Sequence, residues 1–149
     1  MEYLIGLILA LAVSVFASIV GFDRDRVFYP ALLAIIATYY ALFAVMGGSS
    51  RALFIESAII LVFLLAAVIG YKLNLWLIVC GLFAHGVFDF AHAHIIANKG
   101  VPLWWPGFCM AYDVTAAAAL AWLLCRSRRA ARVVDNSYKY KYRPLPSQH

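Results

Sequence analysis

The sequence predicts an all-α integral membrane protein, a five-helix transmembrane bundle. Of its 149 residues, 66% are hydrophobic and 13% are charged, and the mean hydropathy is +0.88. A soluble domain carries roughly twice that share of charged residues. The apolar residues form five runs, each long enough for the roughly 20 residues that a helix needs to cross a bilayer. This composition excludes a soluble enzyme and leaves room for one small site between helices.

The five apolar runs define the expected spans. They cover residues 3–22, 27–46, 51–71, 74–98 and 105–125. The first run begins with Met1-Glu2-Tyr3, which lacks the basic residues of a cleavable signal, so we expect it to be retained as a span. In the second run, Pro30 falls in the first turn, where proline is tolerated. One of the adjacent Tyr39 and Tyr40 is expected to face polar residues of a neighbouring span.

The connections between the runs have compositions typical of turns. Asp23-Arg24-Asp25-Arg26 alternates in charge, and Gly47-Gly48-Ser49-Ser50 is a tight loop. Lys72 and Asn74 mark the third connection. The fourth contains two prolines and the pair Trp104-Trp105, which predicts either an aromatic belt at the membrane interface or a lid over the mouth of a site.

A basic segment, residues 126–149, follows the fifth run. Its cationic residues are Arg126, Arg128, Arg129, Arg132, Lys139, Lys141 and Arg143. We expect a disordered tail that lies in the cytoplasm and contacts anionic lipid headgroups. Five spans then place the N-terminus outside, as in a multi-pass protein of a bacterial inner membrane. No nucleic-acid partner is expected, because no binding module accompanies the basic residues.

The fourth run carries the residues on which the functional interpretation depends. His85, Asp89 and His92 are spaced i, i+4 and i+7, so they share one face of a helix, whereas His94 points the other way. Ionisable groups inside a membrane are costly unless they are paired, hydrated or bound to an ion. We therefore expect this polar stripe to face the interior of the bundle.

Two further carboxylates are expected at the same depth as the stripe. At about 1.5 Å per residue, Glu56 and His92 both lie about 8 Å below the outer boundary, and Asp89 and Asp113 both lie about 12 Å below it. Structural charges scattered along a sequence have no reason to be level with one another. This common depth predicts a single site in the outer half of the bilayer.

The first interpretation of the cluster is a metal site. Imidazole and carboxylate groups bind zinc, iron, manganese and nickel, and helical bundles assemble such sites from facing helices. We expect His85, Asp89 and His92 to be the metal ligands. Glu56 and Asp113 are expected to be catalytic groups, either a general base or further ligands. A divalent transition metal, iron or zinc, would serve the hydrolysis or oxidation of a lipid-like substrate.

The string His85-Gly86-Val87-Phe88-Asp89 resembles the His-Gly-x-x-Asp element of the bacterial Brp/Blh-type carotenoid dioxygenases, which are iron-dependent multispan enzymes. The resemblance covers five residues, and the chain is roughly half the length of such an enzyme. It implies an iron-type site. The other iron-ligand histidines of that family have no counterpart in this sequence. In size and composition the chain otherwise resembles small bacterial multispan membrane proteins.

Two other interpretations stay open. The same groups could relay protons or bind a cation during transport, and five short helices would then require a homo-oligomer. Alternatively, the histidines form structural pairs with carboxylates in a non-catalytic membrane scaffold. A metal site requires the side chains to converge, transport requires a polar path to both ends of the bundle, and a scaffold requires separate pairs without a shared cavity.

Overall fold

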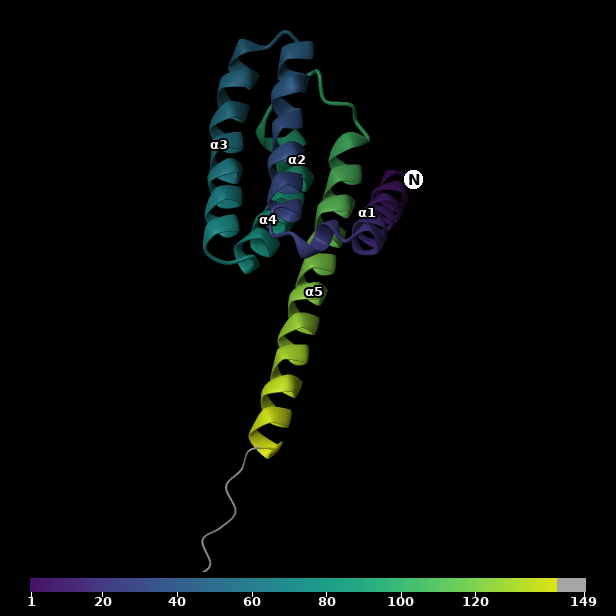
Figure 1. Ribbon diagram of the computed structural model, residues 1–149. Helices are drawn as coiled ribbons and strands as arrows, with labels where there is room; N and C mark the ends of the chain where they lie inside the picture. The colour runs from purple at the N-terminus through teal and green to yellow at the C-terminus, as the bar shows by residue number, and fades with distance from the viewer. Residues whose placement is uncertain (142–149) are drawn as a thin grey trace, which may run out of the picture.

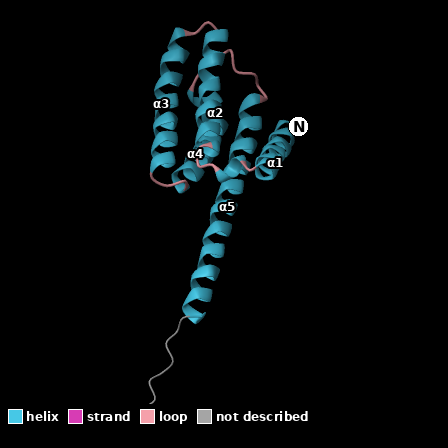
Figure 2. Ribbon diagram, in the orientation of Figure 1, coloured by secondary structure: helices cyan, strands magenta, loops and turns pink. Residues whose placement is uncertain are grey.

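The computed structural model describes residues 1–141, except the side chains of Ala93, Val134 and residues 136–141, and all of its regular secondary structure is helical (Figures 1 and 2). The elements are α1 (Glu2–Val20), the short 3-10 helix η1 (Phe22–Arg24), α2 (Phe28–Met46), α3 (Ser50–Lys72), α4 (Trp76–Ile95) and α5 (Trp105–Lys141). The predicted all-α fold with five helices is confirmed. The described residues contain no strand.

Four helices are long and apolar enough to cross a membrane, namely α1, α2, α3 and the Trp105–Val133 part of α5. The apolar part of α4 is shorter and covers Trp76–His92. Helix α4 is also shorter than the predicted span 74–98, because the backbone leaves the helical conformation at both ends of that span. The Asn74 side chain accepts the backbone N–H of Trp76 at 3.0 Å at the start of the helix, and Ile96 is already extended at its end.

The helices alternate in direction, so the connections gather at two ends of the bundle (Figure 1). The "loop end" comprises the N-terminus and residues 47–49 and 96–104. The "basic end" comprises residues 21–27 and 73–75, together with α5 from Arg126 onward. At the loop end, the Ser49 hydroxyl accepts the backbone N–H of Ala52 at 3.2 Å and caps α3.

The last helix continues past the predicted end of its span. Residues 126–141 belong to α5, where the sequence predicted a disordered tail. Alanine and arginine are good helix formers, and neither glycine nor proline occurs between Phe108 and Arg143, so nothing in the composition ends the helix at Cys125. The rest of the predicted tail, residues 142–149, lies outside the described part of the chain.

Close helix contacts determine which faces meet. Helix α1 packs on α5, α5 packs on α4, and α3 packs on both α2 and α4. A side chain at Gly6 would collide with the carbonyl oxygen of Phe108, so this glycine permits the close approach of α1 to α5. On the basic-end side of His85, the core is mostly aliphatic and contains the fully buried Leu33, Ile78 and Leu82, together with the buried Tyr29.

Candidate functional site

Five charged or histidine side chains are buried among the described residues, and all lie in the half of the bundle nearer the loop end. They are Glu56, His85, Asp89, His92 and Asp113, each at most 1% exposed. They come from α3, α4 and α5, and the three on α4 are the predicted polar stripe. The buried polar groups divide into two sets, which we name the triad and the clamp.

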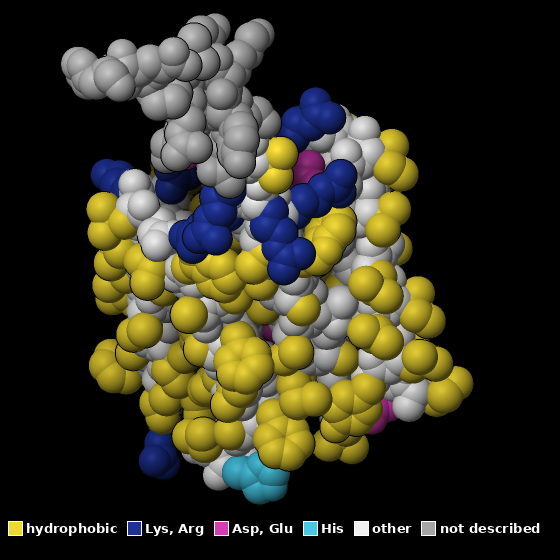
Figure 3. Space-filling view, turned by 90° about the horizontal axis from the view of Figure 1, so that it is seen from below, with side chains coloured by type: hydrophobic (Ala, Val, Ile, Leu, Met, Phe, Trp, Pro, Cys, Tyr) yellow, Lys and Arg dark blue, Asp and Glu magenta, His cyan; other side chains and the backbone are white. Residues whose placement is uncertain are grey.

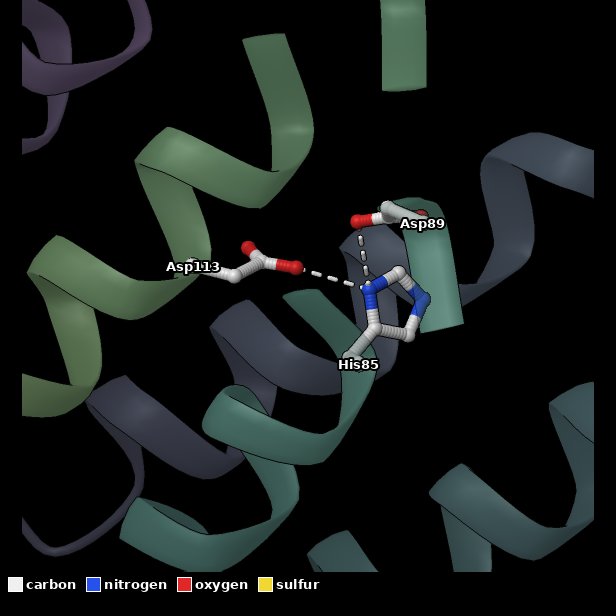
Figure 4. Close-up of side chains that lie close together, drawn as sticks. All are labelled: His85, Asp89 and Asp113. Carbon is white, nitrogen blue, oxygen red and sulfur yellow. Dashed lines mark hydrogen bonds and ion pairs between the residues drawn. The ribbon is translucent and has the colours of Figure 1, made fainter. Parts of the chain in front are cut away.

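The triad consists of His85, Asp89 and Asp113 (Figure 4). The Nδ1 atom of His85 lies 2.7 Å from Oδ2 of Asp113 and 3.2 Å from Oδ2 of Asp89. One potential ligand atom from each residue lies within 4.8 Å of the other two. Figure 4 shows both carboxylates facing the same ring nitrogen, while the other ring nitrogen points away from them.

Gly86 allows α5 to bring Asp113 to this position. A methyl group on Gly86 would lie 3.2 Å from the carbonyl oxygen of Met110 and 3.3 Å from Cβ of Asp113. These separations are tighter than ordinary van der Waals contact, so only a residue without a side chain leaves the two helices at their observed spacing. The glycine that follows His85 therefore sets the distance between α4 and the carboxylate on α5.

The clamp consists of Glu56, His92 and Asn98. Oε1 of Glu56 lies 2.8 Å from Nε2 of His92 and accepts a hydrogen bond of 3.0 Å from the side-chain amide of Asn98. That amide also donates to the backbone carbonyl of Tyr40 at 3.4 Å, and its oxygen accepts the N–H of Gly100 at 3.1 Å. The clamp therefore joins α3, α4 and the connection that follows α4.

Tyr40 connects the triad to the clamp. Its hydroxyl donates a hydrogen bond of 2.6 Å to Oδ1 of Asp89, and its ring stacks on His92 with 4.1 Å between ring centroids. The neighbouring Tyr39 faces elsewhere and packs edge-on against Trp105, with 5.3 Å between the ring centroids. Of the two adjacent tyrosines, Tyr40 is thus the one that faces the polar residues.

An apolar groove of about 660 Å³ lies beside the triad. Its walls come from α1, α2 and α5, and Trp104 and Trp105 line it at the loop end. Cys109 and Tyr112 of α5 also line the groove. Cys109 is one turn before Asp113 on α5 and is buried. The groove and the triad are therefore served by neighbouring turns of the same helix.

The structure groups the predicted site residues differently from the sequence. His85 and Asp89 meet Asp113, which the sequence placed among the catalytic groups, whereas His92, a predicted ligand, pairs with Glu56 instead. His92 is two turns from His85, about 10 Å along α4, and its Nε2 faces Glu56 and not the triad. The i, i+4 pair His85 and Asp89 has the spacing that one ion requires.

Sequence reasoning did not distinguish Tyr40 from Tyr39 and did not identify Asn98 as a member of the site. Two adjacent tyrosines inside an apolar span indicated that a hydroxyl group needs a polar partner. They face different neighbours, and only the rotation of α2 about its axis decides which of them reaches the polar residues. Asn98 stood at the predicted end of a span and had the appearance of an ordinary helix terminus. In the structure it belongs to the extended connection after α4, where its amide reaches Glu56.

No model of a known protein family, no curated protein and no solved structure matches the chain. The resemblance of residues 85–89 to the carotenoid dioxygenases therefore stays a prediction. The function has to be argued from the geometry of the triad, the clamp and the groove.

Proposed function

We propose that the chain is an intramembrane metal-dependent enzyme in which His85, Asp89 and Asp113 bind a divalent transition metal ion beside a groove for a lipid-like substrate. The observation that carries the proposal is the convergence of one imidazole and two carboxylates, from two helices, on a fully buried point. Structural His–Asp pairs need one carboxylate per histidine. Here two carboxylates face the same nitrogen atom.

The distances within the triad fit a metal ion. Ligand atoms on one face of an octahedron, with bonds of about 2.1 Å, are about 3 Å apart. The two measured separations from Nδ1 of His85 are 2.7 and 3.2 Å. Oδ2 of Asp89 and Oδ1 of Asp113 are buried without a hydrogen-bond partner among the described residues, so both carboxylates have coordination capacity left. Iron and zinc both accept this ligand set.

The surrounding residues orient these ligands. A bound ion would supply Lewis-acid activation of a water molecule or of a substrate oxygen. The Tyr40 hydroxyl holds Oδ1 of Asp89 and so leaves Oδ2 toward His85. In the clamp, Oε1 of Glu56 is held by His92 and Asn98, whereas Oε2 has no hydrogen-bond partner in the described part of the chain. Glu56 is therefore the buried carboxylate outside the ligand set that keeps a free acceptor oxygen.

The groove supports a lipid-like substrate. Its volume falls in the range of about 300–1,000 Å³ found for small-molecule sites, and its lining is mostly aliphatic and aromatic. It lies among helices that are apolar enough to be surrounded by lipid, so an apolar molecule can enter from the bilayer. The aromatic pair Trp104-Trp105 would cover the groove at the loop end, which supports the prediction that it forms a lid.

The proposed setting is a bacterial inner membrane crossed five times, with α4 as the shortest span. The positive-inside rule would place the basic end in the cytoplasm and the loop end outside. The triad would then lie in the outer half of the bilayer. The same orientation would bring the arginines of α5 next to anionic lipid headgroups.

Proton transfer is the second candidate, and one observation favours it. Asp113, His85, Asp89 and Tyr40 form a continuous series of hydrogen-bonded or ion-paired groups. Toward the basic end, however, most buried residues of the core are aliphatic, among them Leu33, Ile78 and Leu82, and Tyr29 is the buried residue there that carries a hydroxyl. A relay across the membrane needs polar groups on both sides of the centre, so the structure supports a one-sided site better than a path.

Metal analysis of detergent-purified protein tests the proposal. We expect about one iron or zinc ion per chain in the wild type, and loss of that ion in His85→Ala and Asp113→Asn. His92→Gln is the matched control, because His92 is a buried imidazole on the same helix outside the triad. The proposal fails if folded wild-type protein holds no metal after incubation with Fe²⁺ or Zn²⁺. An ion lost equally from His92→Gln would instead favour the ligand set predicted from sequence.

A further inference from the structure

A second groove, of about 890 Å³, lies at the basic end between α1 and α5, and Tyr29 of α2 also lines it. On α1 it is lined by Leu11, Val15 and Ser18, which are spaced one turn apart on a single face. On α5 it is lined by a second face that begins at Ala119 and reaches Ala130. The groove therefore runs along both helices for several turns.

Polarity changes along this groove in the same direction on both helices. Toward the middle of the bundle the lining residues are mostly apolar, as at Leu11 and Ala119, with the hydroxyl of Ser14 among them. Toward the basic end they become polar and charged, with Ser18 on α1, Arg24 on η1 and Arg126 on α5. An amphiphile with one apolar chain and an anionic head matches this gradient, because its head would lie where the spans end.

The charged part of the groove favours an anion. Two guanidinium groups, those of Arg24 and Arg126, line it against the single carboxylate of Asp23. That carboxylate already accepts a hydrogen bond of 2.6 Å from the Ser18 hydroxyl. The guanidinium of Arg126 also lies over the ring of Trp122, 5.4 Å from its centroid, in the manner of residues at a membrane interface.

The surface around this groove is also positively charged. Seen from the basic end, Lys and Arg side chains gather where α5 leaves the bundle, next to hydrophobic side chains (Figure 3). Diffuse attraction by such a surface would draw anionic lipid toward the protein. The groove adds apolar walls and two arginines on opposite helices, which diffuse attraction does not provide.

We propose that this groove binds one anionic phospholipid, with its phosphate between Arg24 and Arg126 and an acyl chain along the apolar walls. Guanidinium groups hold phosphate oxygens through paired N–H donors, and the two arginine charges disfavour a headgroup that also carries a cation, such as choline. A lipid bound there would fill the space between α1 and α5 and would hold η1 against the base of α5. This site does not depend on the metal site, which is in the other half of the bundle.

Native mass spectrometry of protein released from equimolar phosphatidylglycerol and phosphatidylcholine tests the proposal. We expect one phosphatidylglycerol molecule per chain to be retained preferentially. Arg24→Gln and Arg126→Gln should each weaken its retention about tenfold, because each removes a charge-assisted hydrogen bond. Arg132→Gln is the matched control, since it removes the same charge from the same helix as Arg126 but does not line the groove.

The possible outcomes separate a built site from diffuse charge. Retention weakened equally by Arg132→Gln would overturn the proposal in favour of general attraction by the basic end. Equal retention of phosphatidylcholine would overturn it in favour of a groove that does not distinguish the net charge of the headgroup. Circular dichroism of each variant checks that the helices are intact, and because these arginines are exposed, folding should not depend on them.

Discussion

The hydroxyl of Tyr40 donates a hydrogen bond of 2.6 Å to Oδ1 of Asp89, a residue 49 positions later in the chain. The ring of the same tyrosine stacks on His92. One side chain of α2 thus orients a triad carboxylate with its hydroxyl and supports the clamp imidazole with its ring. Neither contact depends on the other, so a substitution can remove the first and preserve the second.

Replacing Tyr40 by phenylalanine should weaken metal binding without disrupting the fold. The ring remains to stack on His92, but Asp89 loses the donor that orients its carboxylate. Loss of a hydrogen bond that orients a metal-binding side chain typically lowers metal affinity about 10- to 100-fold. Competition with a chelator, measured on purified Tyr40→Phe and wild-type protein, gives the ratio of their metal affinities.

Tyr39→Phe is the control for this measurement, because it removes the same atom from the next residue. Tyr39 packs against Trp105 and lines the apolar groove, with no described contact to the triad. Its metal affinity should equal that of the wild type. Equal losses in the two variants would show that the hydroxyl of Tyr40 has no specific role.

Replacing Gly86 by alanine should lower metal affinity while leaving stability nearly unchanged. The added methyl group meets the Met110 carbonyl and Cβ of Asp113, so α5 must move by a few tenths of an ångström and carry the carboxylate away from His85. The gain in helix propensity, about 1 kcal/mol, opposes the cost of this movement. Metal titration and thermal unfolding in detergent measure the two effects separately.

Gly81→Ala provides the comparison on the same helix. Its added methyl group would meet only Cδ2 of Leu33, the end of a flexible side chain, at 2.8 Å. We expect unchanged metal binding, because no triad residue lies in the path of the new group. If Gly81→Ala weakened metal binding as much as Gly86→Ala, the effect would come from α4 itself and not from its spacing to α5.

The sequence was sufficient to predict the helical fold and which polar residues lie level with one another, because both follow from periodicity and from the length of each apolar run. Glu56 and His92 were expected at one depth, and they are in contact. Asp89 and Asp113 were expected at another, and they share the triad. The helical rise of about 1.5 Å per residue gives the level of each residue along its helix, and this calculation does not require the rotation of the helix.

Rotation and close packing were not predictable in the same way. The choice between Tyr39 and Tyr40 depends on how α2 is turned, which its nearly uniform apolar sequence does not specify. The partner of His92 depends on α3, because Glu56 approaches from that helix. The helical extension of α5 beyond Cys125 was missed because a change in charge was taken as a change in structure, although arginine and alanine both favour helix.

The proposed orientation can be tested by labelling single cysteines in intact cells. In a chain with Cys80, Cys109 and Cys125 replaced by alanine, Ser50→Cys at the loop end should react with a membrane-impermeant maleimide. Ser127→Cys at the basic end should react only after the membrane is permeabilised. Both positions are equivalent small polar residues at opposite ends of the bundle. The reverse pattern would place the basic end outside and would contradict the positive-inside prediction.

The clamp should contribute stability as a coupled unit that is separate from metal binding. Glu56→Met leaves both Nε2 of His92 and the Asn98 amide without their buried acceptor, and such a loss costs about 1–3 kcal/mol. His92→Leu also removes the surface on which Tyr40 stacks, so it should destabilise the protein by a similar amount.

A double-mutant cycle measured by unfolding in SDS tests this coupling. The two substitutions together should cost less than the sum of the single effects by about 0.5–3 kcal/mol, because either one already breaks the same pair. Each folded variant should still bind metal, since the clamp supplies none of the triad ligands. Additive free energies of unfolding would mean that the pair does not act as a unit. Loss of the metal from both single variants would instead place His92 and Glu56 among its ligands.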